Sequence, residues 1–188
     1  MKSLLTKIAG SIAVAGVVVG GVMLKTNDCP IKGDSPQVRL QQLDSLKNRY
    51  PSTITPTPIS FDALAKETDQ TKVVSVEGYV LLVKSGGGET CNCHTTNKDD
   101  MDIHIEIVKS LPATNKDAII CEITRFSKGS YTLKGIEALK GKKVRITGFI
   151  FLDQEHKQNS VIDDPDGNDD WRLSITEIHP VIKIEEVK

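Results

Sequence analysis

Residues 139–152 read LKGKKVRITGFIFL, and this stretch gives the clearest indication of the fold class. Gly141 ends a helical segment, because glycine is the usual residue just past a helix C-terminus. From Lys143 to Leu152 the side chains then alternate, a period that indicates a half-buried β-strand. Val144, Ile146, Ile150 and Leu152 are expected to face inward, and Arg145, Thr147, Phe149 and Phe151 outward. The stretch therefore predicts a short helix that leads directly into a strand.

Four further segments have a strand pattern: Val73–Val83, Met101–Val108, Ala118–Phe126 and Trp171–Val187. The second is predicted to be half-buried, with three isoleucines on one face and Asp102, His104 and Glu106 on the other. Pro180 predicts a bend or bulge in the last strand, because proline has no N–H to donate to a ladder. With the helix at Tyr131–Leu139, the predicted order is β-β-β-α-β-β.

This order, together with LKGKKVRITG, resembles the OB-fold, and the resemblance covers residues 70–188. It implies a mainly β domain, a five-stranded Greek-key barrel with one short helix between strands three and four. The chain also resembles uncharacterised extracytoplasmic OB-like bacterial proteins through TCNCH, DIHIEI, FLDQEH and WRLSITEIHPV, which carry no established activity. The resemblance implies a ligand face on strands one to three, bordered by the loops Lys84–Asp100 and Asp153–Asp170.

Residues 1–24 are predicted to insert into a membrane. Two lysines precede the uncharged run Ile8–Leu24, which as a helix would be about 26 Å long, close to the ~30 Å of bilayer hydrocarbon. The small-x-small site Ala13-Val14-Ala15 comes too early for a signal peptide, so an uncleaved signal anchor is preferred to a cleaved signal peptide. The basic flank places the N-terminus in the cytoplasm. We therefore expect a single-pass protein whose C-terminal domain is outside the cytoplasm, periplasmic or at the cell surface.

Residues 25–69 are predicted to form a partly helical stalk. Ser35-Pro36 begins a helix, and Pro51–Ser60 (PSTITPTPIS) is typical of an extended tether. Val38, Leu40, Leu43 and Leu46 give this helix one apolar stripe up to Tyr50.

The charge balance disfavours nucleic acid as a partner. Lys and Arg number 24 and Asp and Glu 25, which gives a net charge of −1. No broad positive field is available to attract a polyanion.

Thiol and imidazole side chains in the first long loop indicate a metal site. Cys91, Cys93 and His94, completed by His104, are candidate zinc ligands. In an oxidising compartment, Cys91 or Cys93 would instead pair with Cys29 or Cys121. Because Cys121 alternates with Ile119 and Ile123, it is expected in the core. The predicted cofactor is none, or zinc.

A hydrolytic site is the weaker hypothesis. His104 and Glu106 share one strand face, while Glu155 and His156 follow the fourth strand, and a histidine beside a carboxylate suits acid–base chemistry. No G-x-S-x-G motif provides a nucleophile.

Aromatic side chains favour ligand binding without catalysis. The predicted binding residues are Tyr79, His104, Phe149, Phe151, Trp171 and Arg172, a group that would stack a sugar, a base or an aromatic side chain. In the alternative interpretation, the stalk covers both phenylalanines. The predicted function is a membrane-tethered extracytoplasmic binding domain for a protein, peptide or glycan; the alternative is a metal-binding protein or metal-dependent hydrolase.

Overall fold

The computed structural model describes residues 29–50 and 55–188. The predicted membrane segment, residues 1–24, lies outside these ranges, as do residues 51–54 of the predicted tether. Within the described ranges no helix combines the length and the apolar content needed to cross a membrane.

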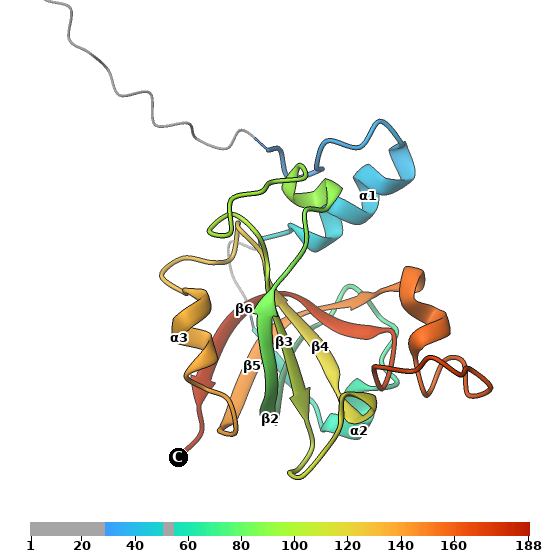
Figure 1. Ribbon diagram of the computed structural model, residues 1–188, viewed down its shortest axis with the longest axis vertical. Helices are drawn as coiled ribbons and strands as arrows, with labels where there is room; N and C mark the ends of the chain where they lie inside the picture. The colour runs from blue at the N-terminus through green and yellow to red at the C-terminus, as the bar shows by residue number, and fades with distance from the viewer. Residues whose placement is uncertain (1–28, 51–54) are drawn as a thin grey trace, which may run out of the picture.

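The described chain consists mainly of strands, with a few short helices (Figure 1). The helices are α1 (Val38–Lys47), α2 (Phe61–Leu64) and α3 (Leu133–Glu137), and three 3-10 turns lie at Thr90–Asn92, Asn115–Asp117 and Gln154–Asn159. The strands are β1 (Thr57–Pro58), β2 (Val73–Ser85), β3 (Ile103–Val108), β4 (Ile119–Ile123), β5 (Lys143–Leu152) and β6 (Thr176–Glu186).

The five long strands close into a barrel. They follow the order β2-β3-β4-β6-β5, and β5 pairs back onto β2. β4 and β6 run parallel, whereas the other long neighbours are antiparallel. With α3 between β4 and β5, this is an OB-like arrangement, so the predicted mainly β barrel is confirmed.

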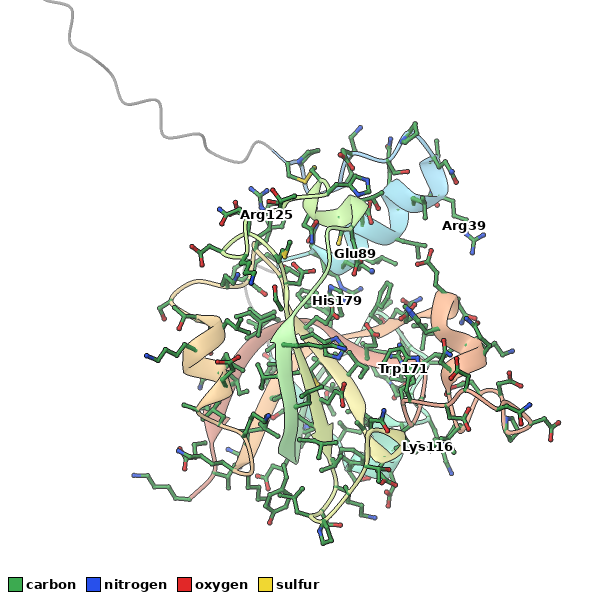
Figure 2. All side chains as sticks on the ribbon, viewed as in Figure 1. Arg39, Glu89, Lys116, Arg125, Trp171 and His179 are labelled. Carbon is green, nitrogen blue, oxygen red and sulfur yellow. A yellow bond between two sulfur atoms is a disulfide. The ribbon has the colours of Figure 1, made fainter. Side chains whose placement is uncertain are left out.

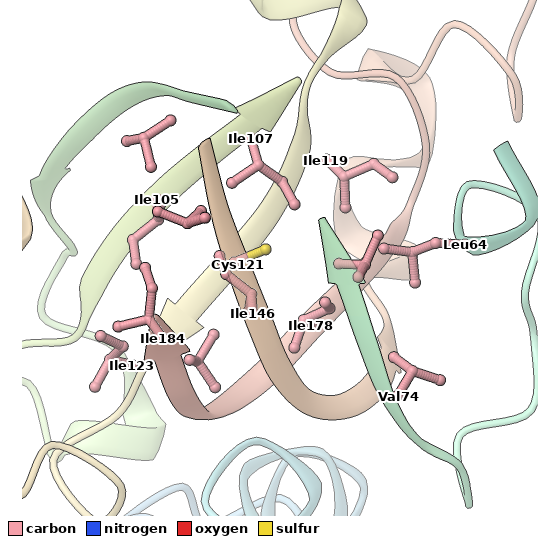
Figure 3. Close-up of a cluster of buried hydrophobic side chains, with 14 of the residues drawn as sticks. Leu64, Val74, Ile105, Ile107, Ile119, Cys121, Ile123, Ile146, Ile178 and Ile184 are labelled. Carbon is pink, nitrogen blue, oxygen red and sulfur yellow. The ribbon is translucent and has the colours of Figure 1, made fainter. Parts of the chain in front are cut away.

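The barrel interior is packed with branched aliphatic side chains (Figure 3). Alternate residues of each strand point inward, among them Ile103, Ile105 and Ile107 of β3, all at most 1% exposed. Cys121 is fully buried among them, as expected. Because full burial of one such side chain contributes about 1.5–3 kcal/mol and a surface ion pair about 0–1 kcal/mol, this core is the main source of stability.

Gly148 allows β5 and β6 to approach closely at the predicted bulge. The register between the two strands shifts on both sides of Gly148, which pairs with Val181, the residue after Pro180. A Cβ atom at position 148 would clash with the Ile178 side chain and the carbonyl oxygen of Pro180. The irregularity predicted from Pro180 is therefore present, and it requires glycine on the facing strand.

The outward face of β3 is buried as well, so the prediction of a half-buried strand is wrong. Asp102, His104 and Glu106 are 3%, 7% and 3% exposed. The loop after β2 and polar side chains from β4 and β6 lie against this face: Cys91 and His179 approach Asp102. Alternation within one strand carries no information about such remote segments.

Residues 29–50, assigned above to a stalk, lie against the barrel. Cys29 forms a disulfide with Cys93 in the loop after β2. Asn48, just after α1, donates a hydrogen bond of 2.7 Å from Nδ2 to the carbonyl oxygen of Cys91. Val38, part of the apolar stripe, is 68% exposed, whereas Asp44 is buried. Polar side chains thus attach this helix to the loop after β2.

The segment that leads into β2 also contributes to the domain core. The Ser60 Oγ atom accepts a hydrogen bond from the backbone N–H of Ala63 and caps α2. Both Phe61 and Leu64 of α2 are buried in the barrel core. A domain that begins at residue 70 would lack these side chains.

Candidate functional site: a cleft beneath α1 and a buried carboxylate–histidine cluster

A cleft of about 790 Å³ lies between α1 and the barrel, and we call it the α1 cleft. Its walls come from α1, the loop after β2 and the loop after β5, and its floor from the outward faces of β3, β4 and β6. In Figure 2, Arg39 and Glu89 mark the α1 side and Trp171 the opposite side. Ligand pockets of proteins typically measure about 300–1,000 Å³, so the cleft is large enough for an organic ligand.

Apolar side chains line two sides of the α1 cleft. Leu40 and Leu43 of α1 form one side, and Leu152 and Trp171 contribute to the other. Trp171, the single tryptophan of the chain, stands edge-on to His156, with ring centroids 5.3 Å apart. A half-buried indole beside aliphatic side chains is a suitable surface for a sugar ring or an apolar peptide side chain.

The lining also carries charged groups that are already paired. Lys47 donates a hydrogen bond of 2.7 Å to Glu89 Oε2, and this pair joins α1 to the loop after β2. Burial alone would lower the pKa of Lys47, but the negative charge of Glu89 outweighs it and raises the pKa above its usual value. Lys47 therefore stays protonated and attached to the cleft wall.

Arg172 is fully buried and is held in place by three acceptors. It donates hydrogen bonds to Asp153 Oδ2 (2.8 Å), Glu177 Oε1 (2.6 Å) and the carbonyl oxygen of Ser174 (2.9 Å). Burial would raise the pKa of Glu177, yet the Arg172 charge prevails and lowers it to about 2. Arg172 thus holds the carboxylates of Asp153 and Glu177 in place at the cleft.

Beneath the cleft lies a cluster of acidic and histidine side chains, all buried except the half-buried Glu122, which we call the buried cluster: Asp102, His104, Glu106, Glu122, Glu177 and His179. His104 lies between two carboxylates: its Nδ1 is 2.9 Å from Glu122 Oε1 and its Nε2 3.4 Å from Glu106 Oε1. Burial would lower the pKa of His104, but these two carboxylates raise it to about 9.

His179 occupies the centre of the buried cluster (Figure 2). Its Nδ1 atom is 3.4 Å from Glu177 Oε2 and 3.5 Å from Glu122 Oε2, and its Nε2 atom is 4.0 Å from Asp102 Oδ2. The pKa of His179 is raised because its acidic neighbours outweigh burial. Burial, and then the charge of Glu122, raise the pKa of Asp102 to about 7.

The structure does not bring together the predicted zinc ligands Cys91, Cys93, His94 and His104. Cys93 is bonded to Cys29 and has no thiolate to offer, so its prediction as a ligand is wrong, while the alternative of a disulfide with Cys29 is confirmed. His94 is 62% exposed and its ring lies 3.8 Å from Asp34. His104 belongs to the buried cluster, and Cys91 approaches it, with its Sγ 3.9 Å from Asp102 Oδ2.

The predicted acid–base residues separate into two groups. His104 is within the buried cluster with Glu106, whereas Glu155 and His156 are exposed on the loop after β5. His156 Nδ1 is 2.6 Å from Asp153 Oδ2. His104, Glu155 and His156 line the α1 cleft, and Glu106 does not.

The predicted binding residues also divide. His104, Phe151, Trp171 and Arg172 line the α1 cleft, whereas Tyr79 and Phe149 do not. The guanidinium of Arg49 lies 4.2 Å from the centre of the Phe149 ring, and Lys47 lies 5.7 Å from that of Phe151. Both phenylalanines are thus in contact with the segment around α1, as in the alternative interpretation.

Four residues of the buried cluster had not been proposed as site residues from the sequence: Asp102, Glu122, Glu177 and His179. Each lies next to an inward isoleucine or cysteine, Asp102 just before β3 and the other three on β4 and β6. The parallel pairing of β4 with β6, at Cys121 and Ile178, brings Glu122 beside His179. The strand order of the OB-like fold, which pairs β4 with β6, was therefore the feature from which their proximity could have been predicted.

The fold and the cleft together define the class: an OB-like barrel whose outward β3–β4–β6 face is roofed by a disulfide-linked helix. No protein-family model and no curated protein matches the chain. Among solved structures, Entamoeba histolytica asparaginyl-tRNA synthetase is similar with a TM-score of 0.41 and 14% sequence identity. That similarity covers 72% of this chain and 24% of the synthetase, so the chain spans about a quarter of that protein's length.

Proposed function

We propose that this chain is a non-catalytic binding protein whose α1 cleft receives a peptide segment or an oligosaccharide. The observation that carries the proposal is the cleft itself, about 790 Å³ and lined by Trp171 as well as by the leucines of α1. A few polar groups on an apolar surface are the usual composition of a ligand site.

The charges of the lining favour neutral or cationic ligands. Among the lining residues, aspartates and glutamates outnumber lysines and arginines, and Arg172 and Lys47 are engaged with carboxylates of the protein. A polyanion would meet repulsion there, whereas a sugar or a peptide with a basic side chain would not. The lining thus supports the expectation that nucleic acid is not the ligand.

The proposal includes a location outside the cytoplasm, on a membrane anchor formed by residues 8–24. The uncharged sequence of that run supports the anchor, and the Cys29–Cys93 disulfide supports the compartment, because disulfides persist mainly in oxidising environments. Protease treatment of intact cells is the test: degradation of the domain from outside is expected, and protection until the cells are lysed would contradict it.

Binding is testable through the fluorescence of Trp171. The full chain is titrated with panels of short peptides and oligosaccharides, and each hit is measured again on Leu43→Arg, which places a charged side chain in the cleft wall. Val38→Arg is the matched control, because it lies on the same helix, is 68% exposed and does not line the cleft. We expect Leu43→Arg to weaken binding at least about tenfold, equivalent to about 1.4 kcal/mol, and Val38→Arg to leave it unchanged.

Two results would count against this function. One is that the hits bind wild-type protein and Leu43→Arg equally, which would show that the ligand site lies outside the α1 cleft. The other is binding of single-stranded nucleic acid that weakens steeply with salt and is lost in Leu43→Arg. The ligand of the α1 cleft would then be nucleic acid rather than a peptide or an oligosaccharide.

A further inference from the structure

Three strands bring three potential metal ligands together at one point of the buried cluster. Asp102 directly precedes β3, Glu122 is on β4 and His179 on β6. One ligand atom from each of the three lies within 4.8 Å of the others. An imidazole nitrogen and two carboxylate oxygens on rigid neighbouring strands are a donor set that divalent transition metals prefer.

Two atoms of this group have unused hydrogen-bonding capacity. Neither His179 Nε2 nor Asp102 Oδ1 has a hydrogen-bond partner among the described residues. His179 is 0% and Asp102 3% exposed, so water does not cover them from outside. Buried polar atoms almost always have a partner, and a shared cation would satisfy both atoms at once.

The electrostatic balance also favours a cation. Asp102, Glu106 and Glu177 are buried in one cluster with the half-buried Glu122, and Arg172 is the only arginine or lysine with a salt bridge to any of the four in the described parts of the chain. That guanidinium is shared with Asp153. Burying carboxylates without compensating charge is strongly unfavourable, so a dication at His179 would offset carboxylate charge that Arg172 and the two histidines balance only in part.

We infer that Asp102, Glu122 and His179 bind one divalent zinc ion beneath the α1 cleft. Zinc is chosen over magnesium and calcium because the set includes an imidazole, whereas those ions prefer oxygen ligands alone. Glu122 both belongs to this set and lines the cleft, so the site has access from the cleft. The site differs from the C-N-C-H loop in which zinc was first expected.

This inference does not depend on the proposed ligand-binding function. Zinc binding is measured in the absence of organic ligand, and peptide or glycan binding is measured through Trp171. Failure of one leaves the other unaffected.

The test uses the full chain, with its disulfide intact, after removal of metals by a chelator. Zinc is titrated by calorimetry, and the bound metal is quantified by elemental analysis. We expect one equivalent of zinc and a higher Tm in its presence. Glu122→Gln keeps the side-chain volume, and we expect it to weaken zinc binding about 100-fold or more, since even loss of an outer-sphere partner weakens metal binding about 10–100-fold.

Two variants serve as matched controls. His94→Ala and His156→Ala each remove an exposed imidazole outside the proposed set, and we expect both to bind zinc like the wild type. His179→Gln is a second ligand variant, and its circular dichroism spectrum reports whether it folds. If it does not fold, Glu122→Gln decides the matter, because its side chain is at the cleft surface.

The inference is overturned if the folded wild-type chain binds less than stoichiometric zinc and shows no rise in Tm. It is also overturned if Glu122→Gln binds zinc like the wild type, or if His94→Ala abolishes binding. The last result would indicate that zinc binds in the loop that contains Cys91 and His94.

Discussion

Arg172→Met should destabilise the protein strongly, because it leaves buried carboxylates without their cation. Arg172 is fully buried and donates to both Asp153 and Glu177. The pKa of Glu177 falls from 4.5 to about 2, and at about 1.4 kcal/mol for each pKa unit this corresponds to about 3 kcal/mol. Removal of one partner of a buried ion pair typically costs about 3–5 kcal/mol. We therefore expect the free energy of unfolding to fall by about 3–5 kcal/mol.

The measurement is urea unfolding at pH 7, followed by far-ultraviolet circular dichroism rather than by the neighbouring Trp171. With a urea dependence of about 2 kcal/mol per molar, typical of small domains, the midpoint should fall by about 1.5–2.5 M.

Arg145→Met is the matched control for this experiment. Arg145 is also 2.6 Å from a carboxylate, Glu77, but both side chains are largely in water, 49% and 35% exposed. Its loss should cost less than about 1 kcal/mol. Equal effects of Arg145→Met and Arg172→Met would refute the argument that burial, rather than distance, determines the contribution of an ion pair.

Three further changes test other features. The raised pKa of His104, about 9, means that its pairing with Glu122 stabilises the fold fully below pH 6.5 and loses that contribution as the pH rises to about 9; urea midpoints should fall over this interval, and less so in His104→Gln. Cys29→Ser removes a disulfide between residues 64 positions apart. The free energy of unfolding should fall by about 2–4 kcal/mol, measured as a lower Tm. An unchanged Tm would show that α1 is held by its hydrogen bonds alone. Gly148→Ala should cost at least about 1–3 kcal/mol, because the new methyl group meets β6; a midpoint equal to that of the wild type would mean that the strands separate there without strain.

The barrel was predictable because its determinants are local. Inward isoleucines and valines alternate within each strand, and Gly141 and Pro180 mark the end of a helix and a bulge within single segments. Cys121 was placed in the core by the same alternation. Each of these features depends on residues that are close together in the sequence, so a pattern with a period of two was sufficient.

The buried cluster was not predictable in the same way, because its residues meet only through strand pairing. Glu122 and His179 come from two parallel strands that are far apart along the chain, and Asp102 reaches them from a third. Exposure was also misjudged. His104 was expected on an open strand face, but the loop that carries Cys91 and the helix joined to it close over that face.

The cleft was partly anticipated. His104, Phe151, Trp171 and Arg172 were chosen for their chemistry, and all four line it. The contribution of α1 was not predicted, because an apolar stripe on a helix does not show whether the helix faces a packed core or a cleft. Leu40 and Leu43 of this stripe line the cleft between α1 and the barrel.

The attachment of α1 by polar contacts, with its leucines lining the cleft, has a thermodynamic consequence. The helix is held by its disulfide and by polar side chains such as Asp44 and Asn48, so an apolar guest would not need to displace any contact that fixes the helix. The leucine surface would be removed from water only when a guest arrives, at about 25 cal/mol for each Å² covered. Association should then be accompanied by a negative change in heat capacity, measurable by calorimetry at several temperatures, with little reorganisation of the host.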